Sequence, residues 1–162
     1  MIDVRQVPPA NKPSGVKPPH SRMIEIINRQ RAHKIDHKTW SDFGQRVSEA
    51  IGSSQAATIV FVSDAAIKKL NQQFRGKNYA TDVLSFPTAA EKFEIESQSH
   101  LGEIVISAQR AAAQAKANGL TFKNEVQQLI LHGLLHLCGY DHETDNGEMN
   151  RMELKLRKKL GI

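Results

Sequence analysis

The chain has 162 residues, of which 40% are hydrophobic and 24% charged, and it contains a single cysteine. This length and composition fit one folded domain and exclude a wholly disordered chain, while one cysteine excludes an internal disulfide or a cysteine-rich metal site. No stretch approaches the roughly 20 apolar residues of a membrane-spanning helix, so we expect a cytoplasmic protein with no membrane partner. The net charge of +5 argues only weakly for a nucleic-acid partner.

Five of the six prolines lie before His20, in a segment with few large apolar residues and no periodicity. Such a composition is typical of a flexible extension. We therefore divide the chain into a Pro-rich N-terminal extension at residues 1–22 and a single domain at residues 23–162.

The first part of this domain alternates predicted strands and helices. Residues 23–27 (MIEII) are suited to a strand, and the clearest strand is ATIVFVSD at 57–64. Between them, Thr39 and Asp42 have the spacing of a capping box, which predicts a helix to about Ile51.

A second helix is predicted after the strand at 57–64. Asp64 can cap it, and Gly76 can end it. Ile67, Leu70 and Phe74 recur at spacings of three and four, which predicts that they share one apolar face.

Two more strands are expected at 81–87 (TDVLSFP) and 101–107 (LGEIVIS). Beyond them the pattern is helical, with start signals at Ser107, Thr121 and Asp145. The predicted class is α/β, more closely α+β. We expect a single compact domain with about four strands in a mixed sheet and helices weighted to the C-terminal half.

Three histidines carry the most specific signal. His132 and His136 are four residues apart on a predicted helix and therefore project from one face. Gly139 can end that helix and let the chain bring His142 back to the same point. Three imidazoles leave a fourth tetrahedral position for water, as in catalytic zinc sites. We predict one Zn²⁺ per chain at the end of a buried helix; ordinary buried or surface histidines are the alternative.

The spacing also nearly matches the metzincin protease pattern H-E-x-x-H-x-x-G-x-x-H. Gly133 stands where those proteases have their general-base glutamate. Zinc can activate water without that glutamate, so phosphodiester hydrolysis is favoured and a metalloprotease or amide hydrolase is the alternative. A third possibility is a non-catalytic RNA-binding module that zinc merely stabilises.

Arg75 is the candidate cation for a phosphate. It is predicted at a helix end beside Gly76, where its guanidinium could pair with phosphate oxygens in a bidentate manner. Loop arginines are common and usually exposed, so a solvated surface residue is the other interpretation.

The segments LNQQFRGKNYATDVLSFP, LGEIVIS and HGLLHLCGYDH, in this order and at these separations, resemble the YbeY family of bacterial endoribonucleases over roughly residues 23–160. The resemblance implies a compact α/β fold, zinc held by His132, His136 and His142, and Arg75 in or beside a catalytic cleft. It also implies a single-stranded RNA substrate and a role in processing the 3′ end of the small-subunit ribosomal RNA and in ribosome quality control. The implied partners are ribosomal RNA and the ribosome or small-subunit assembly proteins.

Several further residues have two interpretations each. Asp141 is a turn residue or a carboxylate partner for a histidine. Only Tyr79 and Tyr140 are obvious aromatic candidates for base stacking near the motifs. One group lies at a strand that could border the cleft, namely Thr81, Asp82 and Ser85. Another group forms a solvated face or an RNA-binding stripe on the last helix, namely Arg151, Lys155, Lys158 and Lys159.

Overall fold

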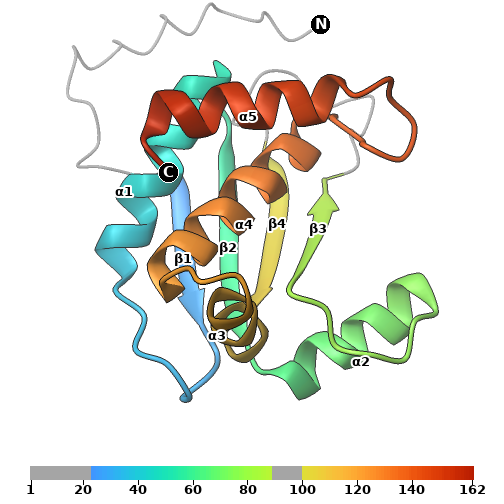
Figure 1. The fold of residues 1–162 in the computed structure, drawn as a ribbon. Coiled ribbons are helices and arrows are strands. Elements are labelled where there is room, and N and C mark those ends of the chain that lie inside the picture. The colour runs from blue at the N-terminus through green and yellow to red at the C-terminus, as the bar shows by residue number, and fades with distance from the viewer. Residues whose placement is uncertain (1–22, 89–99) are drawn as a thin grey trace, which may run out of the picture.

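The computed structural model describes residues 23–88 and 100–162, so the predicted extension at 1–22 lies outside the described residues. Within these ranges the chain forms four strands and five helices (Figure 1). The strands are β1 (Ile24–Asn28), β2 (Ala56–Val62), β3 (Val83–Pro87) and β4 (His100–Ser107). The helices are α1 (His37–Ile51), α2 (Asp64–Arg75), α3 (Ala108–Ala117), α4 (Phe122–Leu137) and α5 (Glu148–Leu160).

In the described part of the chain the strands form one sheet with the order β1-β2-β4-β3. The pairs β1–β2 and β2–β4 are parallel, and β3 pairs with β4 antiparallel at one edge. The mixed four-stranded sheet and the C-terminal weighting of the helices confirm the predicted α+β class. Because β3 is an edge strand, one of its sides faces away from the sheet.

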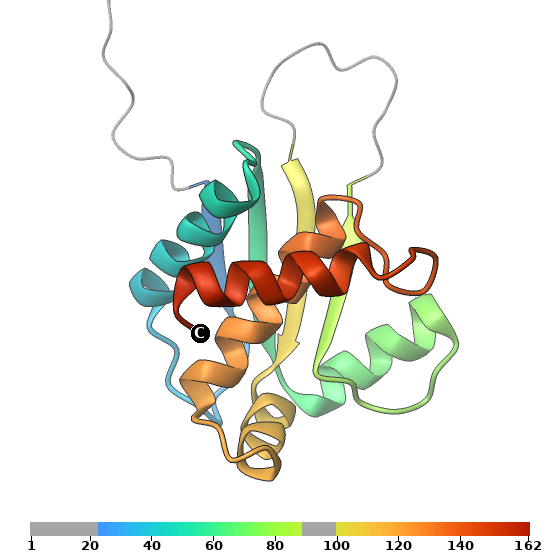
Figure 2. The same ribbon diagram turned by 45° about the horizontal axis from the view of Figure 1, so that its top comes forward.

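The two faces of the sheet are covered by different helices (Figures 1 and 2). In β2, Ile59 and Phe61 belong to the larger apolar core with α1 and α4, whereas Val62 belongs to a smaller cluster with Ile67 of α2. This alternation follows from the two-residue period of a strand. Helix α5 lies over α4 on the larger-core side, as Figure 2 shows.

Helix α4 packs unusually closely on the sheet. Gly133 faces β4, and a Cβ atom at that position would lie 2.8 Å from Cγ2 of Ile104. A glycine is therefore required for this approach. Residues of α4 that flank Gly133 are buried, including Ile130 and Leu134, which are fully inaccessible to solvent.

Two predicted helix caps are shifted in the structure. The N-cap of α1 is Asp36, whose Oδ1 accepts from the backbone N–H of Thr39, so the capping box predicted at Thr39 is wrong. The N-cap of α2 is Ser63, whose Oγ accepts from Ala66 N–H at 3.2 Å. Asp64, the predicted cap, is instead the first helical residue.

The helix starts predicted at Ser107 and Thr121 are confirmed, since each side chain accepts a backbone N–H of the first turn. At α5 the N-cap is Gly147, not Asp145. Asp145 nevertheless accepts from Gly147 N–H and Met149 N–H, each at 2.7 Å, so it binds the helix start from two residues upstream. Among the described residues, no helix has the length and apolar character needed to cross a membrane.

A buried carboxyl group lies between α3, α4 and the start of β3. Glu125 is 5% exposed. In the amide orientation that satisfies both neighbours, Gln114 donates to Asp82 Oδ2 and Glu125 Oε1 at 3.0 Å each. Burial and, after it, the charge of Asp82 raise the pKa of Glu125 above its ordinary value of 4.5. The folded state therefore favours the protonated form, and this contribution to stability is lost as the pH rises through the raised pKa.

We expect Glu125→Gln to be more stable than the wild type at pH 7, because the amide keeps an acceptor oxygen for Gln114 without a buried charge. Below about pH 4 the two proteins should have the same stability, since Glu125 is then neutral in both the folded and unfolded states. Thermal unfolding at a series of pH values measures the difference. A variant that is less stable at neutral pH would show that the ionised carboxylate is needed there.

Candidate metal centre and its cleft

The three predicted histidines come together in the structure. His132 and His136 lie one turn apart on α4, and their Nε2 atoms are 3.1 Å apart. Gly139, with a φ of 95°, turns the chain after α4 so that His142 returns to them. One ring nitrogen from each histidine lies within 4.8 Å of the others, so the cluster could hold a metal ion.

A carboxylate on another helix orients one of these imidazoles. Glu153 of α5 lies 3.2 Å from Nδ1 of His132 and also accepts from Arg157 at 2.5 Å. A proton on Nδ1 that is donated to Glu153 leaves the Nε2 lone pair of His132 free for a metal. Burial raises the pKa of Glu153, but the hydrogen bonds from His132 and Arg157 outweigh it and hold this pKa below its ordinary value.

The electrostatic setting of His136 favours a neutral ring. Burial first, and then the proximity of His132 and His142, lower the pKa of His136; a hydrogen bond with the backbone of Tyr140 and the charge of Asp141 oppose this only partly. Metals bind the neutral imidazole. The donor set of the cluster therefore fits a divalent ion that prefers nitrogen ligands.

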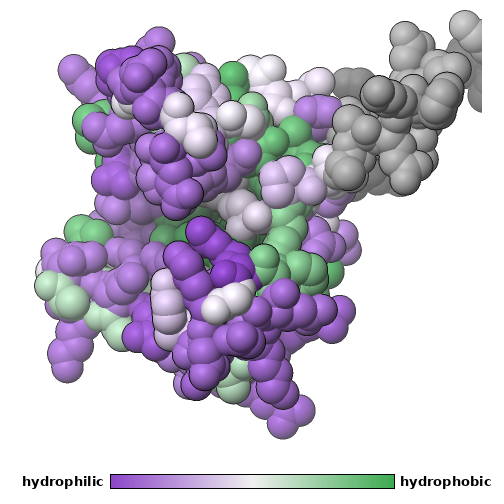
Figure 3. All heavy atoms as spheres, turned by 90° about the vertical axis from the view of Figure 1, so that its right-hand side faces the viewer, coloured by the Kyte–Doolittle hydropathy of each residue, from purple (hydrophilic) through white to green (hydrophobic). Residues whose placement is uncertain are grey.

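The histidines open onto a cleft of about 740 Å³. Figure 3 shows this side of the molecule, where hydrophobic atoms lie in a hollow between hydrophilic surfaces. The cleft is lined by the end of α2, by β3 with the residues before it, by α4 and by the loop after α4. All three predicted border residues line it, namely Thr81, Asp82 and Ser85.

Arg75 is the last residue of α2, is exposed, and lines the same cleft as the histidines. Gly76, in the left-handed conformation with a φ of 67°, ends the helix directly after it. Arg75 is thus both exposed to solvent and at the cleft, and its role as the cation for a phosphate stays a prediction.

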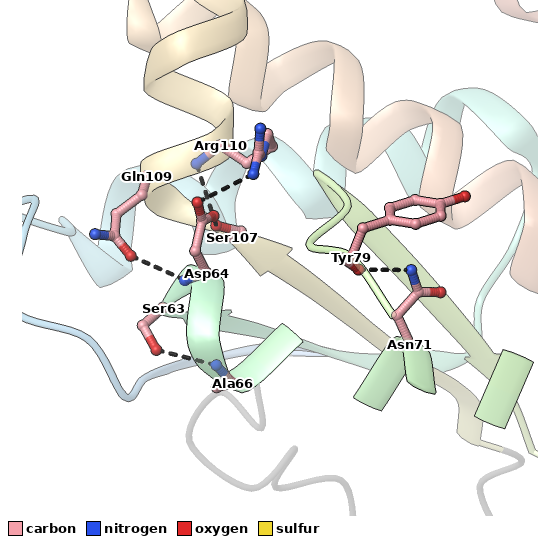
Figure 4. A network of polar contacts seen from close by, with 8 residues as sticks. All are labelled: Ser63, Asp64, Ala66, Asn71, Tyr79, Ser107, Gln109 and Arg110. Atoms are coloured by element: carbon pink, nitrogen blue, oxygen red, sulfur yellow. Dashed lines mark hydrogen bonds and ion pairs between the residues drawn. The ribbon is translucent and has the colours of Figure 1, made fainter. Parts of the chain in front are cut away.

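Polar contacts at both ends of α2 fix its position (Figure 4). At the N-terminal end, Asp64 accepts from the hydroxyl of Ser107 at 2.5 Å and from the guanidinium of Arg110 at 3.3 Å. Near the C-terminal end, the buried amide of Asn71 donates to the backbone oxygen of Tyr79 at 2.9 Å. These contacts connect α2 to the start of α3 and to the loop that leads into β3.

Two residues in or beside the loop after α4 have contacts that bear on their roles. Asp141 Oδ1 accepts from the backbone N–H of Glu143 at 3.0 Å, which is the contact of a turn residue. Cys138 is partly buried, and burial raises the pKa of its thiol. A thiol with a raised pKa is a poor metal ligand, so Cys138 is a small, partly buried apolar residue beside the site.

Sequence reasoning missed the partner of His132. Glu153 and Arg157 have the spacing of an ion pair on a helix surface. No local pattern indicated that this pair faces α4, because the contact joins residues 21 positions apart on two packed helices.

The α+β fold and the three-histidine cluster in an open cleft are those of a candidate metal-dependent hydrolase. The chain matches the family model described as "Endoribonuclease YbeY" over residues 25–161, and it belongs to that family. Curated relatives named "Endoribonuclease YbeY" include those of Solibacter usitatus, 41% identical over 74% of this chain and 76% of the relative, and Helicobacter pylori, 39% identical over 80% and 91%. A solution structure of a Thermotoga maritima protein aligns with a TM-score of 0.59 and 30% identity, covering 85% of this chain and 89% of that one.

We expect the purified protein to contain about one equivalent of divalent metal per chain and His136→Ala to contain little or none. Elemental analysis after exhaustive buffer exchange measures this content. His37→Ala, which removes an exposed histidine from the first turn of α1, is the matched control and should keep its metal. Equal metal in the two variants would show that the ion is bound elsewhere.

Glu153→Ala should weaken metal binding by about 10- to 100-fold, because His132 loses the partner that holds its Nδ1 proton. Competition against a chelator measures the affinity. Glu153→Gln keeps an acceptor oxygen and should have an intermediate affinity. Glu148→Ala removes an exposed glutamate from the same helix and should bind as the wild type does; a Glu153→Ala variant with wild-type affinity would rule out the orienting role.

Proposed function

We propose that this protein is a zinc-dependent endoribonuclease that cuts single-stranded RNA, with the activity carried by residues 23–162. The observation that supports it most is the shared cleft, which joins three histidines of suitable geometry to an exposed arginine. The curated relatives are themselves named endoribonucleases. In the described residues the cluster contains no thiolate or carboxylate ligand, and three imidazoles with an open position suit zinc.

In this proposal His132, His136 and His142 hold the zinc ion, and Glu153 keeps the first of them in the tautomer that binds it. A bound zinc ion supplies a water of lowered pKa and polarises the phosphoryl group. No side chain at position 133 is required for this chemistry. Gly133 faces the sheet and not the cleft, which leaves no room for the general base of a metalloprotease.

Arg75 has the role of the phosphate-binding cation. Its guanidinium can form two parallel hydrogen bonds with phosphate oxygens, and it can balance the negative charge that develops on the phosphorus group during displacement. The anchored position of α2, through Asp64 and Asn71, keeps Arg75 at the cleft. The helix thereby holds the backbone of Arg75 beside the place where the phosphate would bind.

The substrate that we propose is ribosomal RNA, at the 3′ end of the small-subunit species, with ribosome or assembly proteins as partners in the cytoplasm. The choice of ribosomal RNA as substrate, and of these partners, rests on the membership of the chain in the family. The cleft volume of about 740 Å³ lies in the range of small-ligand sites, about 300–1,000 Å³. Such a cleft suits an unpaired strand better than an A-form duplex, whose bases are stacked inside.

Arg75→Ala should reduce cleavage of single-stranded RNA by about 100-fold or more while leaving zinc content unchanged, because the cation stabilises charge and does not bind the metal. The measurement is single-turnover cleavage of an end-labelled oligoribonucleotide by the zinc-loaded protein, alongside elemental analysis. Arg31→Ala, which removes an exposed arginine just after β1, is the control and should cut at the wild-type rate.

His136→Ala should lose both zinc and cleavage in the same assay, with circular dichroism to check that it remains folded. Wild-type cleavage by Arg75→Ala would overturn the role of that arginine. Bound zinc with no RNA cleavage by the wild type would overturn the endoribonuclease and leave a zinc-stabilised RNA-binding module. Zinc-dependent cleavage of an unstructured protein would favour an amide hydrolase.

A further inference from the structure

Two phenylalanine rings line the cleft beside Arg75. Phe74 is the preceding residue on α2, and Phe86 lies on the edge strand β3. Their ring centroids are 5.2 Å apart and the planes meet at 68°, an edge-to-face pair. Phe74 is 59% exposed despite this contact.

This exposure is not what the sequence pattern predicts. Phe74 was expected to share an apolar face with Ile67 and Leu70, but along that face only Ile67 is buried completely and Leu70 is partly buried. The packing of α2 on the sheet therefore does not depend on the ring of Phe74. The ring of Phe74 contacts Phe86 instead, and this contact leaves more than half of the surface of Phe74 in contact with solvent.

The surroundings of the pair are those of a nucleic-acid site. Arg75 supplies a positive charge at the next residue, and the histidine cluster lies in the same cleft. Proteins that bind single strands combine cationic groups along the backbone with aromatic side chains on which bases stack. A protein partner would need about 800 Å² of surface on each side, far more than two rings inside a cleft provide.

We propose that Phe74 and Phe86 form a stacking step for one unpaired base next to the phosphate that Arg75 contacts. This inference rests on the proposed function and extends it to the choice of substrate. A base in a duplex is already stacked between its neighbours and cannot reach the step without being unpaired. The pair therefore selects single-stranded RNA at the residue beside the cut.

The test measures KM for cleavage of a short single-stranded oligoribonucleotide by the zinc-loaded protein. Phe74→Ala should raise KM about 10-fold, the usual effect of removing one stacking partner, whereas Phe74→Tyr keeps an aromatic face and should remain near the wild type. Phe74 is exposed, so thermal unfolding should be little changed. The control is Leu154→Ala, which removes an apolar side chain of similar exposure, 57%, from α5 outside the cleft and should leave KM unchanged.

A set of substrates with single abasic positions tests the contact itself. In the wild type, one abasic position beside the cut should raise KM about as much as Phe74→Ala does. In Phe74→Ala the same abasic position should cause a smaller further loss, because the base has already lost its contact with the exposed ring. Phe74→Ala with wild-type KM, or with undiminished sensitivity to that abasic position, would overturn the stacking step while the endoribonuclease stands.

A binding measurement tests base stacking on Phe74 independently of RNA cleavage. An oligoribonucleotide with 2-aminopurine in place of successive bases should lose fluorescence at one position when bound to the wild type and regain it with Phe74→Ala. If the wild type cuts no RNA, the proposed function fails, and this signal still decides whether a base stacks on Phe74. Equal quenching by the two proteins would overturn the stacking step.

Discussion

The site depends on the close approach of α4 to β4. At Gly133 the two elements are so near that one added methyl group would overlap the side chain of Ile104. This contact sets the rotation of α4 about its axis, because it decides which side of the helix faces the sheet. His132 and His136 lie together on another face of the helix, so their direction toward the cleft is a consequence of the packing inside the core.

The opposite side of α4 is held by polar contacts instead. Glu153 of α5 reaches His132, and Arg157 binds the same carboxylate. His132 and Arg157 both bind the carboxylate of Glu153 in low-dielectric surroundings, where an unpaired charge would be costly, while the buried Nε of Arg157 has no hydrogen-bond partner. Helix α4 is thus fixed by apolar packing on one side and by a charged network on the other, and both act on the same imidazole.

Much of the fold and the metal site could be predicted from the sequence because their signals are local. The spacing of His132 and His136 and the alternation in β2 depend only on the periods of a helix and a strand. The role of Glu153 could not be predicted, since it arises from contact between two helices. The spacing of Phe74 correctly places it on the apolar face of α2, but spacing does not indicate how far along the helix the core reaches, and Phe74 in the last turn lines the cleft instead.

The turn at Gly139 has a consequence for how the cleft keeps its shape. His142 lies on the loop that joins α4 to α5, so an ion held by all three histidines would tie that loop to α4 in the manner of a cross-link. Closing the short loop between His136 and His142 would restrict its local unfolding, and with it the wall formed by Tyr140 and Glu143. The ion would then stabilise the loop against local unfolding as well as take part in the chemistry. Removing it with a chelator would make the loop on one side of the cleft more mobile.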